Sequence, residues 1–406
     1  MVYKARSSRV WPKHSKVSPR RVVMSSLDHF LKVQRDFYKL IGFDYFTVGD
    51  SWQYRGMCFV VGLSSITPFI ATAVFHNLTR VEELCDSLCA LLITILGLSK
   101  YAMMVHLRGD FTDLIKRFRK MIDQEFHKEN GLRHVIEKEN RRDQMISRLI
   151  RNIFCVVWLI NSSLPHINRV ITYRQTGKWE PYMPYPCYFP WSTESSPNYI
   201  LSYLWSIFAG LSVVLAAIAI DTLFCGLTHH LCAFFKITQN RMATYRCSTQ
   251  KETEDNLKEI FKIYQDSLNM CVRLNECFAP LIFVQFFVSS LQLCVVGYLF
   301  STHFNEPQGM YYGAYMVSAL IQIFCYCYCG EYLKTESFNF GWAIYDSPWY
   351  EETRSSVGIT RSMLISMMRA QDACRITGYF FEANMQAFSA IIRTAMSYIT
   401  MLRSLS

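Results

Sequence analysis

Five stretches of the chain run for 17 or more residues without a charged side chain, and they constrain the fold more than any other feature. They cover residues 56–79, 152–168, 195–220, 277–305 and 307–330. A helix needs about 20 mostly apolar residues to cross the hydrocarbon core of a bilayer. A buried helix of a soluble protein explains one apolar run of about 10–14 residues, but not five longer ones. The sequence therefore predicts a membrane protein.

Two further apolar stretches are interrupted by charges. Residues 88–107 are broken only by Lys100, and residues 376–402 contain Glu382 and Arg393. With both included, we predict an all-α membrane protein whose cytoplasmic helix extensions form an intracellular bundle. Its seven transmembrane helices are expected at about 57–77, 88–107, 152–173, 199–220, 278–302, 310–330 and 384–402.

The basic residues set the orientation of these spans. The loops on one side hold 35 Lys and Arg, and the loops on the other side hold five. Because basic loops stay in the cytoplasm, the N-terminus is predicted to be cytoplasmic and the C-terminus extracellular. The net charge of +10 would suggest nucleic acid on a soluble protein, but here it marks the cytoplasmic face, and no nucleic-acid partner is expected. No cleavable signal peptide is visible in the first 50 residues.

The outer loop between the third and fourth spans is rich in proline and aromatic residues over 179–191. Proline breaks helices and aromatic rings need cover, so we expect an ordered lid packed on the outer end of the bundle. This lid either only seals the domain or also caps an apolar ligand cavity. Its Cys187 would need Cys85 or Cys89 as a disulfide partner, and the sequence does not decide between a bond and free thiols.

Two charges inside the spans need an explanation, because ionisable groups are costly in a bilayer. Lys100 lies about 10 Å from the inner end of its span, and we interpret it as a side chain that snorkels to the interface. Near the middle of the last span, a line of one residue every four positions consists of Arg393, Ser397, Met401 and Leu405. Such a line suits a helix that borders water; the alternative is hydrogen bonding to neighbouring helices. One helix cannot enclose a pore, so conduction requires several subunits.

Apolar residues also recur at helical spacing in the cytoplasmic loops, within residues 111–126, 257–272 and 363–368. These amphipathic helices need partners for their apolar stripes. They extend the spans into one intracellular bundle, or they form a subunit interface, and the two interpretations are compatible.

We find none of the usual catalytic motifs, so the chain is not expected to be an enzyme, and no cofactor is expected. Cys325, Cys327 and Cys329 alternate along a helix and point to different sides, so no metal site is expected there. The adjacent His229 and His230 are interpreted as satisfied interfacial side chains. Asn77, in the sequon Asn77-Leu78-Thr79 at the outer end of the first span, is a candidate glycosylation site.

The C-terminal third resembles the insect odorant receptor family. The resemblance rests on the segments Tyr326-Cys327-Tyr328-Cys329-Gly330-Glu331, Ala343-Ile344-Tyr345-Asp346, Trp349-Tyr350, Arg369-Ala370-Gln371, Ile376-Thr377-Gly378 and Ser397-Tyr398-Ile399-Thr400-Met401-Leu402-Arg403. It implies an odorant-gated, non-selective cation channel in the plasma membrane of a sensory neuron dendrite. The partners implied are the common odorant co-receptor in a heterotetramer, a small apolar volatile ligand and membrane lipid.

The family resemblance also implies where sites lie. The gate positions carried over are Met401 and Leu405, and the ligand cavity is placed in the outer half, between spans 2, 3, 4 and 6. The co-receptor carries a long insertion after span 4, for which residues 221–277 leave no room, so this chain looks like a tuning subunit. A related gustatory receptor, a metabotropic seven-span receptor with an outside N-terminus, and a transporter are the alternatives.

These expectations divide the chain into four parts. They are a cytoplasmic N-terminal region (1–56), transmembrane helices 1–6 with a ligand-binding outer half (57–330), cytoplasmic interface helices (331–375) and a pore-lining seventh helix (376–406). The ligand-binding residues predicted from their outer positions on spans 3, 4 and 6 are Trp158, Ser162, His166, Tyr203, Phe208, Tyr312 and Met316.

Overall fold

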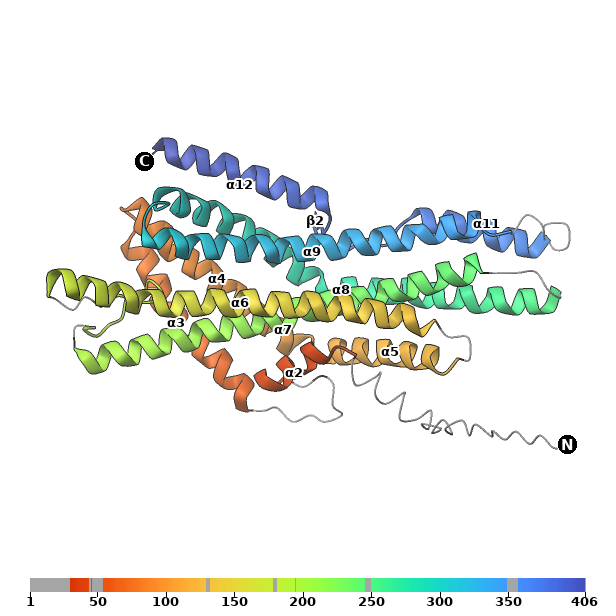
Figure 1. Ribbon diagram of the computed structural model, residues 1–406, viewed down its shortest axis with the longest axis horizontal. Helices are drawn as coiled ribbons and strands as arrows, with labels where there is room; N and C mark the ends of the chain where they lie inside the picture. The colour runs from red at the N-terminus through yellow and green to blue at the C-terminus, as the bar shows by residue number, and fades with distance from the viewer. Residues whose placement is uncertain are drawn as a thin grey trace, which may run out of the picture.

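The computed structural model describes residues 30–43, 45, 54–128, 132–177, 181–193, 195–244, 250–348 and 357–405, and it is almost entirely helical (Figure 1). Its helices are α2 (Lys32–Ile41), α3 (Tyr54–His76), α4 (Val81–His106), α5 (Arg108–Phe126), α6 (Arg133–Thr176), α7 (Ser196–Ala243), α8 (Gln250–Thr302), α9 (Pro307–Tyr345), α11 (Val357–Gln371) and α12 (Met385–Leu405). The predicted all-α fold is confirmed.

Six helices in the described part of the chain are long and apolar enough to cross a membrane: α3, α4, α6, α7, α8 and α9. They coincide with the first six predicted spans. The seventh predicted span is helix α12, which is less apolar and lies outside this set. Its helical conformation is as predicted, and its passage through the membrane stays a prediction.

Helix α7 forms the centre of the bundle. It is apolar on all sides, as expected of a helix with no solvent-facing stripe. From Ile218 to Phe235 every residue is buried. In this inner half, aromatic rings fill the space between helices: Phe224 stacks on Tyr326 with ring centroids 4.8 Å apart, and Tyr264 stacks on Phe340 at 4.1 Å. The inner half is therefore a tightly packed core.

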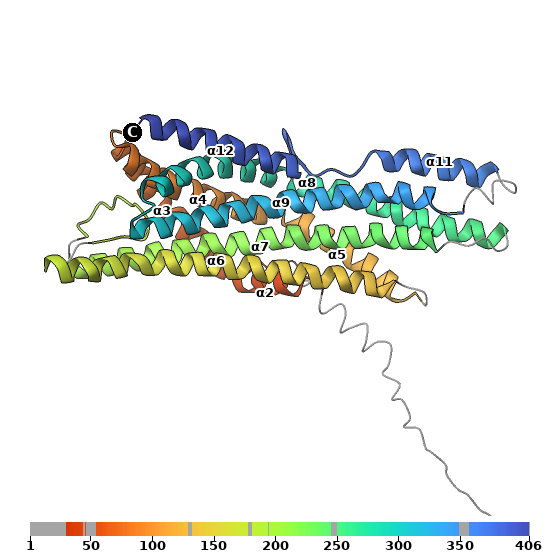
Figure 2. The same cartoon turned by 45° about the horizontal axis from the view of Figure 1, so that its top comes forward.

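The three amphipathic segments predicted to be cytoplasmic are helical, as expected, and the first two bury most of their apolar stripes. Helix α5 buries its apolar stripe, which consists of Phe111, Leu114, Ile115, Phe118, Ile122 and Phe126. The inner parts of α8 and α9 and the helix α11 continue the bundle beyond the apolar spans (Figure 2). The interpretation of these segments as extensions of one helical bundle is confirmed, whereas their cytoplasmic location and their role between subunits stay predictions.

A short hairpin leads from α11 into α12. Strand β1 (Thr377–Gly378) pairs antiparallel with strand β2 (Phe381–Glu382). A Cβ on Gly378 would lie 2.6 Å from the backbone nitrogen of Phe283, so only glycine permits this close approach to α8. Helix α12 then runs along the outside of α8 and α9, and its C-terminal end lies near the turn between α3 and α4 (Figures 1 and 2).

Candidate ligand cavity

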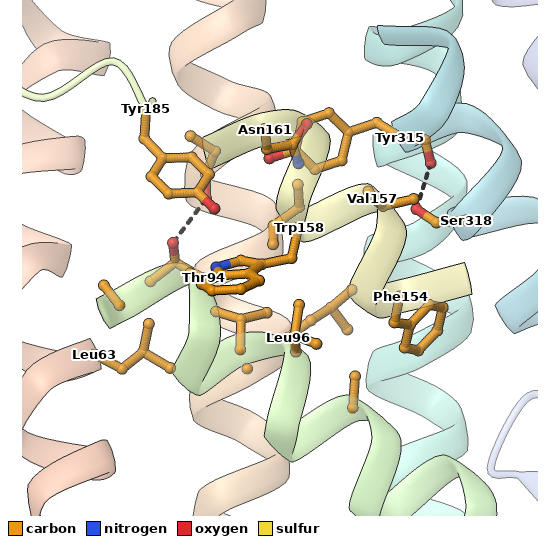
Figure 3. A pocket seen from close by; sticks show the side chains of 18 of the residues that line it. Leu63, Thr94, Leu96, Phe154, Val157, Trp158, Asn161, Tyr185, Tyr315 and Ser318 are labelled. Carbon is orange, nitrogen blue, oxygen red and sulfur yellow. Dashed lines mark hydrogen bonds between the residues drawn. The ribbon is translucent and has the colours of Figure 1, made fainter. Parts of the chain in front are cut away.

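The outer half of the bundle encloses a cavity of about 100 Å³ between α3, α4, α6, α7, α8 and α9 (Figure 3). Its wall is mostly aliphatic and aromatic, which is typical of sites for small apolar ligands. Small residues of α7 keep the space open, because Ala209, Gly210 and Ala217 all line it. The wall residues with polar side-chain atoms are Thr94, Lys100, Trp158, Asn161, Tyr185, Gln292, Tyr315, Ser318 and Gln322.

The loop between α6 and α7 closes the outer end of this cavity. The backbone N–H of Tyr188 donates to the carbonyl of Phe69 at 3.0 Å, and the Trp191 indole N–H donates to Ser202 Oγ at 2.9 Å. The rings of Phe69, Phe189 and Trp191 pack together with centroids 5.2–5.9 Å apart. The predicted ordered lid is confirmed over residues 181–191; its first two residues, 179–180, lie outside the described part.

Tyr185 of the lid separates two spaces. It lines the inner cavity and also an outer vestibule of about 520 Å³ beneath the rest of the lid. Figure 3 shows its ring pointing down toward Thr94 and Trp158. A Cβ at Gly210 would overlap the Tyr185 hydroxyl, so glycine is needed there for the ring to reach this depth. Burial raises the pKa of Tyr185 to about 12, so the phenol is neutral at physiological pH.

The floor of the cavity is a buried ion pair. Lys100 Nζ lies 2.7 Å and 2.8 Å from the two carboxylate oxygens of Asp221, and the side chains are 1% and 3% exposed. Asp221 also accepts hydrogen bonds from Gln322 Nε2 at 2.5 Å and from the Tyr326 hydroxyl at 2.7 Å. The prediction that Lys100 snorkels to the interface is therefore wrong: pairing with a carboxylate one helix away offsets its desolvation inside the bundle.

Of the residues predicted to bind ligand, Trp158 lines the cavity, and its indole N–H donates to the carbonyl of Ile207 at 3.4 Å. Three others meet closer to the outer surface. The Tyr203 hydroxyl donates to the Ser162 carbonyl at 2.6 Å, and the Tyr203 ring lies 4.3 Å from that of His166.

The remaining three predicted ligand residues lie elsewhere in the outer half. Phe208 stacks on Phe59 at 5.5 Å, and Met316 packs against the apolar core. Tyr312 lines the outer vestibule and donates a hydrogen bond to Asp86 at 3.1 Å. A contact with ligand stays a prediction for all seven positions.

The line of Arg393, Ser397 and Met401 on α12, here called the polar line after its first two residues, faces away from the rest of the bundle. Arg393, Ser397 and Met401 are exposed, whereas Ala395 on the other side of the helix is buried. The Ser397 hydroxyl donates to the carbonyl of Arg393 at 3.1 Å. Leu405 is the last residue of α12, and its side chain lies outside the described part of the chain.

Asp221 and Asn161 are two of the polar residues at the cavity that sequence reasoning missed as site residues. Asp221 comes directly after the uncharged stretch 195–220 and was counted as part of a cytoplasmic loop. The lysine within a predicted span was the signal that could have found it, because a buried cation needs an anion at the same depth.

Several other predicted sites are also described. Asn77 lies in the turn between α3 and α4 and donates from Nδ2 to Ser87 Oγ at 3.0 Å, so its glycosylation stays a prediction. Cys85, Cys89 and Cys187 are free thiols. His229 Nδ1 lies 3.1 Å from Glu139 Oε2, but neither ring nitrogen of His230 has a hydrogen-bond partner in the described structure, so the expectation of satisfied histidines holds only for His229 Nδ1.

Comparisons with known proteins give consistent results. Residues 80–396 match the family model described as 7tm Odorant receptor. Odorant receptor 47a of Drosophila melanogaster is 48% identical over 94% of this chain and 100% of its own length. Putative odorant receptor 98b of the same species is 35% identical over 90% of this chain and 95% of its own length.

A solved structure has the same fold. The insect olfactory receptor OR5 from Machilis hrabei, in complex with eugenol, matches with a TM-score of 0.75 over 96% of this chain and 100% of that chain. The sequence identity is 14%, so this likeness concerns the arrangement of the helices.

Proposed function

The chain belongs to the 7tm odorant receptor family, and on that premise we propose that it binds a small volatile ligand in the lid-capped cavity and opens a cation channel in response. It is a membrane receptor of the odorant receptor class and not an enzyme. The observation that carries the proposal is the enclosed apolar cavity itself. Its one lysine is neutralised by Asp221, so the wall offers shape and dispersion rather than net charge to a ligand.

We propose that ligand binding is transmitted to α12 through α9. Gln322 of α9 lies on the cavity wall, and two residues further on, the Phe324 ring contacts the Phe388 ring of α12 at 5.5 Å. Lys334 of α9 also pairs with Glu382, just before α12, at 2.9 Å. A ligand that fits the cavity better when α9 is shifted stabilises that state, since only differential affinity moves an equilibrium.

We propose that conduction takes place between subunits, with α12 beside the pore. The outward-facing line of Arg393, Ser397 and Met401 supports this role, because these side chains are exposed on the single chain. Helix α11 lies beyond the apolar spans, on the side that we propose to be cytoplasmic. Its side chains Leu364, Ile365 and Met368 are exposed. We propose that these faces meet the common odorant co-receptor in a heterotetramer in the plasma membrane of a sensory neuron dendrite.

The test is the current evoked by volatile panels in cells that express this chain with the co-receptor. We expect ligand-dependent cation current, and Trp158→Ala should change the rank order of potency across volatiles by altering the cavity wall. Surface-expressed complexes that pass no current with any volatile would refute the proposal.

The pore position is tested separately. Met401→Ser should raise the resting leak or alter ion permeability, because it introduces a polar group at the proposed constriction. Met396→Ser is the matched control on the same helix, since Met396 is exposed but lies off the polar line. Equal behaviour of the two variants would argue against a gate at Met401.

A further inference from the structure

Asn161 is a polar residue on the mostly apolar wall of the cavity. It lies on α6 in the wall of the cavity, beside Trp158 and Tyr315, and is 2% exposed (Figure 3). Its side-chain oxygen Oδ1 is buried and has no hydrogen-bond partner in the described structure. An unpaired buried amide destabilises the folded protein, so its presence on a cavity wall points to a partner that the chain itself does not supply.

The backbone carbonyl of Asn161 is a second acceptor that lacks its usual donor. Pro165 follows Asn161 by four residues on α6, and proline has no N–H. The carbonyl oxygen of Asn161 therefore lacks the helical hydrogen bond that residue 165 would otherwise donate. The side chain and main chain of one residue both leave acceptor capacity unused.

Four other polar side chains of the wall are already engaged with the protein. Lys100 and Gln322 donate to Asp221 on the floor. The Thr94 hydroxyl donates to the carbonyl of Ala90 at 2.8 Å, and the Ser318 hydroxyl donates to the carbonyl of Tyr315 at 2.8 Å. Among the described wall residues, Asn161 Oδ1 is the fully buried side-chain polar atom that has no hydrogen-bond partner.

We propose that Asn161 is the polar anchor of the cavity and selects ligands that carry a hydroxyl group, that is, small alcohols. This inference rests on the proposed function of the cavity as the ligand site. A hydroxyl both donates and accepts, so it pairs with the amide whichever of its two polar atoms faces the ligand, whereas an ether or ester oxygen only accepts. The cavity of about 100 Å³ is smaller than the roughly 150 Å³ cavity that admits benzene, a molecule of six heavy atoms, so about six heavy atoms is the upper limit for a ligand.

The first test compares three probes of equal heavy-atom number on the receptor co-expressed with the co-receptor. The probes are 1-pentanol, its isomer butyl methyl ether, and hexane. We expect 1-pentanol to evoke current at a concentration roughly tenfold lower than the ether, the value of one net hydrogen bond in a dry site. Equal potency of the alcohol and the ether would overturn the proposal.

The variant Asn161→Leu keeps the size of the side chain and removes its polarity. It should abolish the preference for the alcohol and leave the potency of hexane unchanged or improved. Asn168→Leu is the matched control, since Asn168 is on the same helix but lines the outer vestibule. A preference for 1-pentanol that persists in Asn161→Leu would contradict the assignment.

A binding readout separates this inference from the proposed function. In the purified full-length protein, 1-pentanol should raise the thermal unfolding midpoint of the wild type more than butyl methyl ether does, and Asn161→Leu should lose that difference. The unliganded Asn161→Leu variant should unfold at no lower temperature than the wild type, because it no longer buries an unpaired amide. Stabilisation that depends on Asn161 without any current would refute the channel proposal and support the anchor. Current whose ligand preference does not depend on Asn161 would support the channel proposal and refute the anchor. If neither the current nor the Asn161-dependent stabilisation were seen, the anchor would be overturned.

Discussion

The outer and inner halves of the bundle are built from the same long helices but are packed in opposite ways. Around α7 the outer half uses Ala209, Gly210 and Ala217 and leaves a cavity, whereas the inner half fills the space with rings such as Phe224 and Tyr326. A hollow end can adapt to a ligand, and a close-packed end transmits displacement without absorbing it. The difference places ligand recognition and mechanical coupling at opposite ends of one set of helices.

The largest effect is expected at the border between the halves, where the Lys100–Asp221 pair forms the cavity floor. Asp221→Leu leaves a buried lysine without its counter-charge and should lower the free energy of unfolding by about 3–5 kcal/mol. The measurement is chemical or thermal unfolding of the purified protein in detergent, together with surface expression.

The double variant Lys100→Met/Asp221→Leu supplies the control. It replaces both charges with apolar side chains and should recover most of the lost stability. If Asp221→Leu were as stable as the wild type, the ion pair would contribute nothing to the free energy of unfolding. Apolar packing alone would then stabilise the contact between the two halves.

A second prediction compares equal truncations in the two halves. Leu223→Ala in the inner half should destabilise by about 4 kcal/mol, near the upper end for leucine truncation, because Leu223 is fully buried in close packing. Leu63→Ala on the cavity wall should cost about 2 kcal/mol, since that side chain already lacks neighbours on its cavity side. Unfolding midpoints of the two variants measure the difference. Equal losses would show that the outer half is as closely packed as the inner one.

A third prediction concerns the entrance to the cavity. Gly210→Ala places a methyl group where the Tyr185 hydroxyl now lies, so the ring must withdraw toward the vestibule. We expect ligand potency to change by roughly tenfold, corresponding to the 1–3 kcal/mol typical of overpacking. Concentration–response curves measure the change. Gly109→Ala is the control, because nothing lies within 4 Å of a Cβ there, and an equal response in both variants would argue against Tyr185 as the divider.

Long-range patterns in the sequence predicted the fold well, but they could not predict which pairs of side chains are in contact. Long apolar stretches, five of them uncharged and one broken only by Lys100, predicted the six long spans because bilayer thickness fixes their length. Helical periodicity gave α5, and proline with aromatic content gave the lid. The pairing of Lys100 with Asp221 could not be predicted, because the two residues are 121 positions apart and their relative depth depends on how α4 and α7 pack.

The family resemblance predicted a ligand cavity in the half of the bundle where the structure has a cavity, but most of the residues that line this cavity were not predicted. Trp158 was chosen for its outer position on α6, and so were Ser162 and His166, yet only Trp158 lies on the cavity wall. The helical rotation that decides which side chain points inward depends on packing between helices. The role of Asn161 depends on a missing partner, which no single sequence reveals.

The smallest effect is expected at the outer rim, where His303 lies between two carboxylates. Its Nε2 is 2.7 Å from Glu82 and its Nδ1 is 2.7 Å from Glu306. Partial burial opposes the charged form, but hydrogen bonds and charges of the two glutamates outweigh it and raise the pKa of His303 above its usual value of about 6.5. A raised folded-state pKa gives stabilisation that is complete below pH ~6.5 and is lost as the pH rises through the folded value.

The thermal unfolding midpoint should therefore fall slightly between about pH 6 and pH 8, and His303→Gln should remove that part of the slope. The Tyr312 ring lies 5.7 Å from His303, and Tyr312 donates to Asp86, so both residues must be kept in the test protein. Because the glutamates are about half exposed, salt should weaken the effect. A slope that persists in His303→Gln would assign the pH dependence to another part of the molecule, including the ion pairs of the inner half.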